Sequence, residues 1–182
     1  MGHSNRKISE FIQILDSYKL KLVVDIRTIP KSRHNPQFGG QRLKNSLARH
    51  GIEYTHMAGL GGLRHARKDS VNKAWRNSSF RGYADYMQSA EFSKSLRHLI
   101  ARSKRKRLVM MCAEAVPWRC HRSLVGDSLL AQGLFVEDIF GVASHRPHKL
   151  TPFAKVRNKK VTYPFSALSR NYASGLKSKE KI

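Results

Sequence analysis

The chain has 182 residues, of which 35 are Lys or Arg and 12 are Asp or Glu, so its formal net charge is +23. This length suits one domain with a real core and is short for two. No apolar run approaches the roughly 18 residues of a membrane span and no secretory signal is visible, so we expect a cytoplasmic protein. The cationic excess favours a polyanionic partner, most simply a nucleic acid.

The first half of the chain predicts two helices and two strands. The segment LKLVVDI is almost uninterrupted apolar, as a central parallel strand is. A turn-rich basic loop follows it. The predicted elements are a helix over 5–17 capped by Ser4, a strand over 20–26, a loop over 28–41, a helix over 42–50 and a strand over 52–57.

The second half continues the alternation of helices and strands. Residues 64–79 are polar and basic without a clear period, which indicates a loop or insertion. The further predictions are helices over 80–87 and 90–102, the second capped by Ser89, a strand over 108–112, a helix over 120–133, and a strand over 134–140. We therefore predict a single α/β domain over 1–165, with a mainly parallel sheet and helices on both faces, and a basic tail over 166–182 that is dispensable for folding.

The stretch Leu108 to Gly133 predicts strand, loop and helix in that order, with polar residues at the turn. In open α/β sheets that edge is where ligands bind. Another predicted strand ends in polar residues at the same edge. The predicted site therefore gathers Asp25, Arg27, Cys112, Glu114, Cys120, His121 and Arg122.

Two cysteines in a cytosolic-looking chain indicate thiols or metal ligands rather than a structural disulfide. Cys120 precedes a predicted helix among cations, which favours a thiolate acting as a nucleophile or redox group. The alternative for Cys120 is a buried small hydrophobe, which we expect more strongly for Cys112. Glu114 is either a general acid or base or an ion-pair partner that shapes the loop, and Asp25 has the same two interpretations.

Basic and glycine-rich residues at this edge suit an anionic substrate. Arg27 and Arg122 would hold anionic oxygen. A glycine pair lets a backbone approach a ligand, although it also suits a tight turn. The predicted substrate-binding residues are Arg27, Arg33, Arg122, His3, Ser4, Gly61 and Gly62.

Two known types of cysteine loop fit the spacing poorly. Cys112 and Arg119 are one residue too far apart for a phosphatase loop, and Glu114 would repel phosphate there. Zinc could take Cys112, Cys120, His121 and one more His, but this is no two-residue clip, and adjacent Cys and His rarely reach one ion. We therefore predict no cofactor, with zinc as the alternative.

The motifs of the chain, in their order, resemble the domain-of-unknown-function 488 family from about Gly2 to His148. The resemblance implies a compact three-layer α/β domain and no established reaction. Members usually carry a strand before the Gly-His-Ser motif, and here Met1 directly precedes that motif. The motifs that carry the resemblance are His3-Ser4-Asn5-Arg6, Val24-Asp25-Ile26-Arg27 with Pro30 and Ser32-Arg33, Phe38, Leu60-Gly61-Gly62, Cys112-Ala113-Glu114 and Cys120-His121-Arg122.

The leading hypothesis from the sequence is an enzyme that processes a nucleic acid or nucleotide, with Cys120 or Glu114 as its reactive group. Cys112, Asp25 and His121 complete the predicted catalytic set. The rivals are a non-catalytic nucleic-acid-binding module whose polar cluster is structural, and a redox sensor that uses the two cysteines.

Overall fold

A three-stranded parallel sheet forms the centre of the computed structural model, which describes residues 1–167 and 169. The strands are β1 (Leu22–Asp25), β2 (Glu53–His56) and β3 (Leu108–Met111), in the order β2-β1-β3. All four residues of β1 are buried, because β1 is paired with a strand on each side and both faces of the sheet are covered. This central strand is the one that the apolar segment LKLVVDI predicted.

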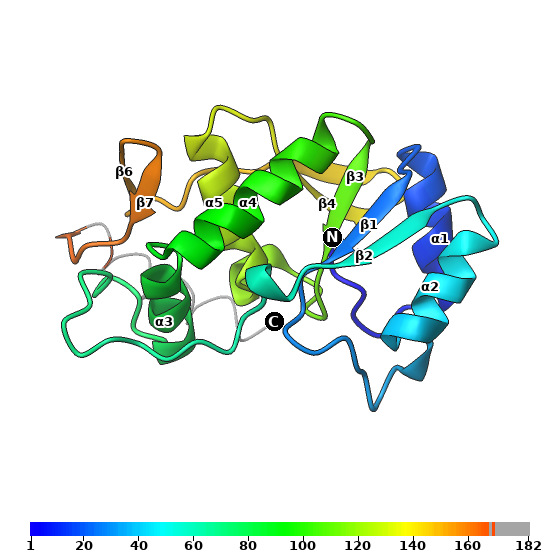
Figure 1. Cartoon of the computed structure of the whole chain (residues 1–182), viewed down its shortest axis with the longest axis horizontal. Helices are drawn as coiled ribbons and strands as arrows, with labels where there is room; N and C mark the ends of the chain where they lie inside the picture. The colour runs from blue at the N-terminus through cyan, green and yellow to red at the C-terminus, as the bar shows by residue number, and fades with distance from the viewer. Residues whose placement is uncertain (168, 170–182) are drawn as a thin grey trace.

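Alternate side chains of β1 supply two separate cores, one on each face of the sheet. Leu22, Val24 and Ile26 belong to one core and Val23 to the other, as the period of two in a strand requires. Helices on both faces complete the predicted three layers (Figure 1). The helices are α1 (Ile8–Ser17) and α2 (Gly40–Ala48) on the Val23 face, and α3 (Ser78–Tyr86), α4 (Ala90–Ser103) and α5 (Arg122–Ala131) on the Leu22 face.

The order of the strands creates a topological switch point at the carboxyl ends of β1 and β3. From β1 the chain passes through α2 to β2 on one side, and later returns through α3 and α4 to place β3 on the other side of β1. The chain therefore leaves β1 and enters α5 in different directions at this edge. Such a topological switch point is the usual ligand site of an open α/β sheet.

Two antiparallel hairpins follow α5. They are β4 (Glu137–Gly141) with β5 (Ser144–Pro147), and β6 (Lys155–Arg157) with β7 (Lys160–Thr162). The predicted strand over 134–140 thus starts later and pairs with β5 rather than with the parallel sheet. Short 3-10 helices occupy the loops at Pro36–Phe38, Ala58–Leu60 and Pro117–Arg119.

The start of the chain corrects one prediction. Ser4 does not cap α1, which begins at Ile8 after Lys7 and has no side-chain cap. Instead, the backbone N–H groups of His3 and Ser4 donate to the carbonyls of Cys112 and Ala113, each at 2.9 Å. These bonds to the end of β3 hold the segment away from the helix. The cap predicted at Ser89 is confirmed, because its hydroxyl accepts from the N–H of Phe92 at 3.1 Å.

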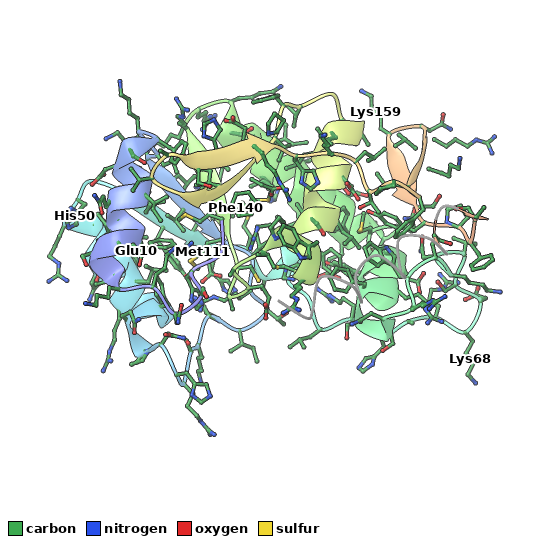
Figure 2. The ribbon with its side chains drawn as sticks, turned by 180° about the vertical axis from the view of Figure 1, so that it is seen from behind. Glu10, His50, Lys68, Met111, Phe140 and Lys159 are labelled. Atoms are coloured by element: carbon green, nitrogen blue, oxygen red, sulfur yellow. The ribbon has the colours of Figure 1, made fainter. Side chains whose placement is uncertain are left out.

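Among residues 1–167 and 169, no helix has the length and apolar character needed to cross a bilayer. Most of the predicted tail over 166–182 lies outside the described residues. Figure 2 views the molecule from behind, with Met111 in its interior and with Lys68 and Lys159 at the end away from His50.

Candidate functional site: a thiol–imidazole cluster

Three of the predicted site residues converge at the carboxyl edge of the sheet. The Sγ atoms of Cys112 and Cys120 and a ring nitrogen of His121 all lie within 4.8 Å of one another. Cys112 directly follows β3, whereas Cys120 and His121 lie between the last 3-10 helix and α5. The cluster therefore lies at the edge of the sheet where its winding reverses.

The backbone explains how two adjacent side chains reach the same point. Cys120 is extended, with φ −134° and ψ 141°, whereas His121 is helical, with φ −55° and ψ −16°. Successive side chains of a continuous strand point to opposite faces. The change from extended to helical backbone removes that alternation, so Cys120 Sγ lies 3.8 Å from His121 Nδ1.

The imidazole of His121 is oriented by the neighbouring strand. Its Nε2 lies 3.0 Å from the carbonyl oxygen of Ile26. Because a carbonyl only accepts, Nε2 carries a hydrogen, and Nδ1 is the ring atom that faces the thiols. Gly62 lies against this ring: a Cβ there would come within 3.1 Å of Nδ1. The hydroxyl of Thr28 donates to the Gly62 carbonyl at 3.0 Å and holds the glycine in place.

The two thiols titrate as a coupled pair. Both side chains are buried, and two groups this close do not ionise independently. The hydrogen bond from the Cys120 thiol lowers the pKa of Cys112 to about 3, against the opposing effect of burial and with further help from His121 and Arg122. The same bond, together with burial, raises the pKa of Cys120. The sequence predicted a thiolate on Cys120, whereas the coupling between the two thiols favours a thiolate on Cys112.

Arg122 is the buried cation of the site, with 3% of its side chain exposed. Its backbone N–H donates to Cys120 Sγ at 3.4 Å, and its Nη1 lies 3.8 Å from the same sulfur and 3.3 Å from the carbonyl of Glu114. Its Nε has no hydrogen-bond partner within the described part of the chain. Glu114 itself is exposed, and this contact uses its backbone rather than its carboxylate.

Asp25 and Arg27 form a second network beside the cluster. The Asp25 carboxylate is fully buried and accepts from Arg27 Nη2 at 2.6 Å and from the Tyr54 hydroxyl at 2.8 Å. Arg27 Nη2 also donates to the carbonyl of Phe38 at 2.8 Å. Burial and the Asp25 carboxylate raise the pKa of Tyr54 above its usual range. The geometry gives this pair a structural task, since it ties the loop after β1 to the sheet.

His3 extends that network. Its Nδ1–H donates to the carbonyl of Ser4 at 2.7 Å, and its Nε2 accepts from Arg27 Nη1 at 3.3 Å. The ring stacks on Phe38 with centroids 4.3 Å apart. Burial lowers the pKa of His3, so the ring is neutral, as these hydrogen bonds require. The exposed face that a ligand would need is thus absent at Phe38, whose ring is buried against His3.

The remaining predicted residues lie around the cluster rather than in it. Arg33 is exposed on the loop after β1. Gly61 is buried, and a Cβ on it would lie 2.7 Å from the Cα of Thr28, so this turn requires a glycine for close packing. Leu63, which follows the glycine pair, is 79% exposed at φ 54°. A non-glycine residue in the left-handed region is costly and concentrates at functional sites.

A second polar cluster was missed by sequence reasoning. His148 bridges two carboxylates: its Nδ1 lies 2.9 Å from Asp138 and its Nε2 lies 3.3 Å from Asp127. Asp127 also accepts from the Tyr163 hydroxyl at 2.8 Å and from the Thr151 N–H at 3.0 Å. Burial would lower the pKa of His148, but the bonds to Asp127 and Asp138 outweigh it and raise the pKa to about 9. Only the spacing of these residues was visible in the sequence, and it follows no known motif.

The fold and the cluster define the class of protein: a doubly wound α/β domain with a thiol–imidazole site at its topological switch point. The profile of the family described as Domain of unknown function DUF488 matches residues 7–129, which is more than half of the chain. The chain therefore belongs to this family, as the motifs predicted. The match includes Cys112, Cys120 and His121 and ends before Asp138 and His148. No curated protein and no solved structure matches the chain.

Proposed function

We propose that this protein is an enzyme that processes a nucleic acid or nucleotide, with Cys112, Cys120 and His121 as its reaction centre. The observation that carries the proposal is the convergence of these three side chains at the switch point of the sheet. Perturbed titratable groups that gather at a topological switch point favour a catalytic site over a structural one.

The cluster contains charged and polar groups that remain able to interact with a substrate. The low pKa of Cys112 gives the thiol pair a negative charge at neutral pH, and His121 Nδ1 lies 3.8 Å from Cys120 Sγ. Arg122 Nη1 lies 3.8 Å from Cys120 Sγ, and Nε has no partner among the described residues, so the guanidinium is the candidate group to hold an anionic oxygen of a substrate. Glu114 lies exposed on the same loop and is the candidate for proton transfer.

The charge of the chain supports an anionic substrate. The chain has a formal net charge of +23. Protein surfaces usually mix both signs of charge, so an excess this large favours an anionic partner. Lys31 and Arg33 are exposed on the loop that leaves β1 at the edge of the site. A phosphate backbone held by such residues would pass in front of the cluster.

The test measures binding and site occupancy in one experiment. Fluorescence anisotropy at two salt concentrations reports binding of a labelled oligonucleotide to the metal-free, reduced protein. We expect affinity to fall with a slope of about −0.7 to −0.9 for each neutralised phosphate. Iodoacetamide labelling, with peptide mass spectrometry, then compares Cys112 and Cys120 with and without saturating oligonucleotide. We expect the bound oligonucleotide to slow alkylation of both.

A matched pair of charge reversals locates the binding surface. The test variant is Arg33→Glu, at an exposed residue of the loop after β1. The control is Arg157→Glu, at an exposed residue of β6. We expect the first to weaken binding more and to abolish protection of the thiols. Binding without protection would favour a non-catalytic binding module, and no binding at low salt would remove the proposed substrate class.

A further inference from the structure

We propose that Cys112, Cys120 and His121 form a three-ligand site for a soft divalent cation, with zinc as the best fit. The inference deepens the proposed function, because it assigns the chemistry of the reaction centre. It rests on that function only for the use of the metal in a reaction, since the site itself is defined by its donor atoms.

The spacing of the donor atoms is close to that of a zinc tetrahedron. Zinc binds sulfur at about 2.3 Å and histidine nitrogen at about 2.0–2.1 Å, so tetrahedral angles place two sulfurs about 3.8 Å apart and sulfur and nitrogen about 3.6 Å apart. Cys120 Sγ and His121 Nδ1 are 3.8 Å apart, and all three donor atoms lie within 4.8 Å. Displacements of the side chains by less than the length of a covalent bond would bring the three donor atoms onto one ion.

The surroundings of the cluster are those of a metal site. A ligating histidine usually donates its other ring N–H to a carbonyl or carboxylate, and His121 Nε2 donates to Ile26. The N–H of Arg122 donates to Cys120 Sγ, as an outer-shell donor to a ligating thiolate does. Because Gly62 has no side chain, the His121 ring has room to keep Nδ1 directed toward the sulfurs.

The ligand count indicates the use of such a site. Structural zinc sites have four protein ligands, whereas catalytic sites have three and keep one position for water or substrate. In the part of the chain that the structure describes, the cluster offers three. A bound ion would also compensate buried thiolates, which are costly without a partner. The sequence argument against zinc was that adjacent Cys and His diverge, and here they converge.

Cobalt(II) is the probe for the wild-type protein, because it takes the zinc geometry and absorbs light. The full chain is reduced and freed of metal, and cobalt is added under nitrogen. We expect one equivalent to produce thiolate-to-cobalt charge-transfer bands and the intense visible bands of a tetrahedral ion. One equivalent of zinc should then displace the cobalt and protect both cysteines from iodoacetamide.

Matched variants assign the ligands. His121→Gln and Cys120→Ser should each abolish the stoichiometric cobalt spectrum, whereas His50→Gln, on an exposed histidine, should leave it unchanged. Gly62→Ala should weaken zinc binding, because its Cβ would lie 3.1 Å from His121 Nδ1 and displace the ligating ring. Its control is Gly141→Ala, whose Cβ would meet only Ser144 at an ordinary 3.7 Å. Circular dichroism confirms that each variant is folded.

Two outcomes would overturn the metal site: absence of a tetrahedral cobalt spectrum in the wild type, or an undiminished spectrum in folded His121→Gln. Formation of a Cys112–Cys120 disulfide that zinc does not prevent would also reject it in favour of a redox pair. Failure of the proposed function looks different. In that case zinc binds as expected, but the oligonucleotide neither binds nor protects the thiols.

Discussion

Two buried polar clusters contact the same helix and have opposite character. At the start of α5, Arg122 lies beside the Cys112–Cys120 pair, and its Nε has no partner within residues 1–167 and 169. Further along, Asp127 accepts three hydrogen bonds within a network that includes His148. The thiol–imidazole cluster thus contains a donor without a partner among the described residues, whereas the polar groups of the Asp127 cluster are hydrogen-bonded to one another.

The difference separates a candidate reaction site from a structural junction. Buried polar groups are nearly always paired, so an unpaired one in a folded protein requires an explanation such as a ligand or a catalytic role. The Asp127 cluster requires none, because its bonds join α5 to β4 and to the segment that carries Thr151 and Tyr163. Stability should therefore depend on the second cluster, and ligand chemistry on the first.

The largest expected effect on stability comes from Asp127→Ala. The change leaves His148 beside one carboxylate instead of two and removes the acceptor of the buried Tyr163 hydroxyl. We expect the free energy of unfolding to fall by about 3–5 kcal/mol, as when a buried ion pair loses one partner. Urea denaturation followed by circular dichroism measures the change.

The control for this variant is Asp69→Ala, which removes an exposed carboxylate paired with Arg67. That change should leave the free energy of unfolding nearly unchanged, because exposed ion pairs contribute little. Equal losses in the two variants would contradict the structural role of Asp127.

The next effect is a dependence of stability on pH that originates from His148. Its pKa is raised to about 9 in the folded protein, against an ordinary value of 6.5. A raised pKa means that the stabilisation is complete below about 6.5 and is lost as the pH rises through 9. The groups that face His148 are Asp127 and Asp138, with Tyr163 beyond Asp127 and Arg122 near Asp138.

We expect a loss on the order of 2 kcal/mol across this pH window. Urea denaturation at pH 6, 7, 8 and 9 measures it, because these values run from below the ordinary pKa of histidine up to the folded pKa of His148. His148→Gln should remove this part of the slope, and His50→Gln should retain it. A slope that survives in folded His148→Gln would assign it to other groups.

A smaller effect is expected from Arg122→Met. This change replaces a buried cation of incomplete hydrogen bonding by an apolar side chain of similar length. The change also removes the desolvation cost of a buried cation whose hydrogen bonding is incomplete, so the free energy of unfolding should change by no more than about 1 kcal/mol. Oligonucleotide affinity should nevertheless fall. A loss of stability as large as that of Asp127→Ala would show that Arg122 is a structural residue.

The smallest effect on stability should come from Cys120→Ala, which instead changes the titration of Cys112. The pKa of Cys112 is lowered to about 3 mainly by the Cys120 thiol, so thiolate absorbance in the ultraviolet should already be present at pH 6. Without that donor the pKa should rise toward the ordinary value of about 8.5. Cys120→Ser retains a donor and should keep most of the shift. Identical titrations in the two variants would show that His121 and Arg122 are sufficient.

The sequence by itself determined the elements that local patterns control. The apolar segment before Asp25 and the short apolar run that ends at Met111 predicted two parallel strands, and both lie in the central sheet. The cap at Ser89 was predicted correctly, because a cap involves only its own first turn. The candidate list also contained all three members of the thiol–imidazole cluster, since each follows a predicted strand or precedes a predicted helix.

Only the tertiary structure decided which of those residues meet. Ser4 has the sequence of a helix cap, but the carbonyl of Ala113, distant along the chain, takes its backbone N–H. Asp25 and Arg27 pair with each other beneath Tyr54, and the thiolate belongs to a pair rather than to one cysteine. Local patterns depend on neighbours within one turn or one strand, whereas a site depends on side chains that the crossing of several segments brings together.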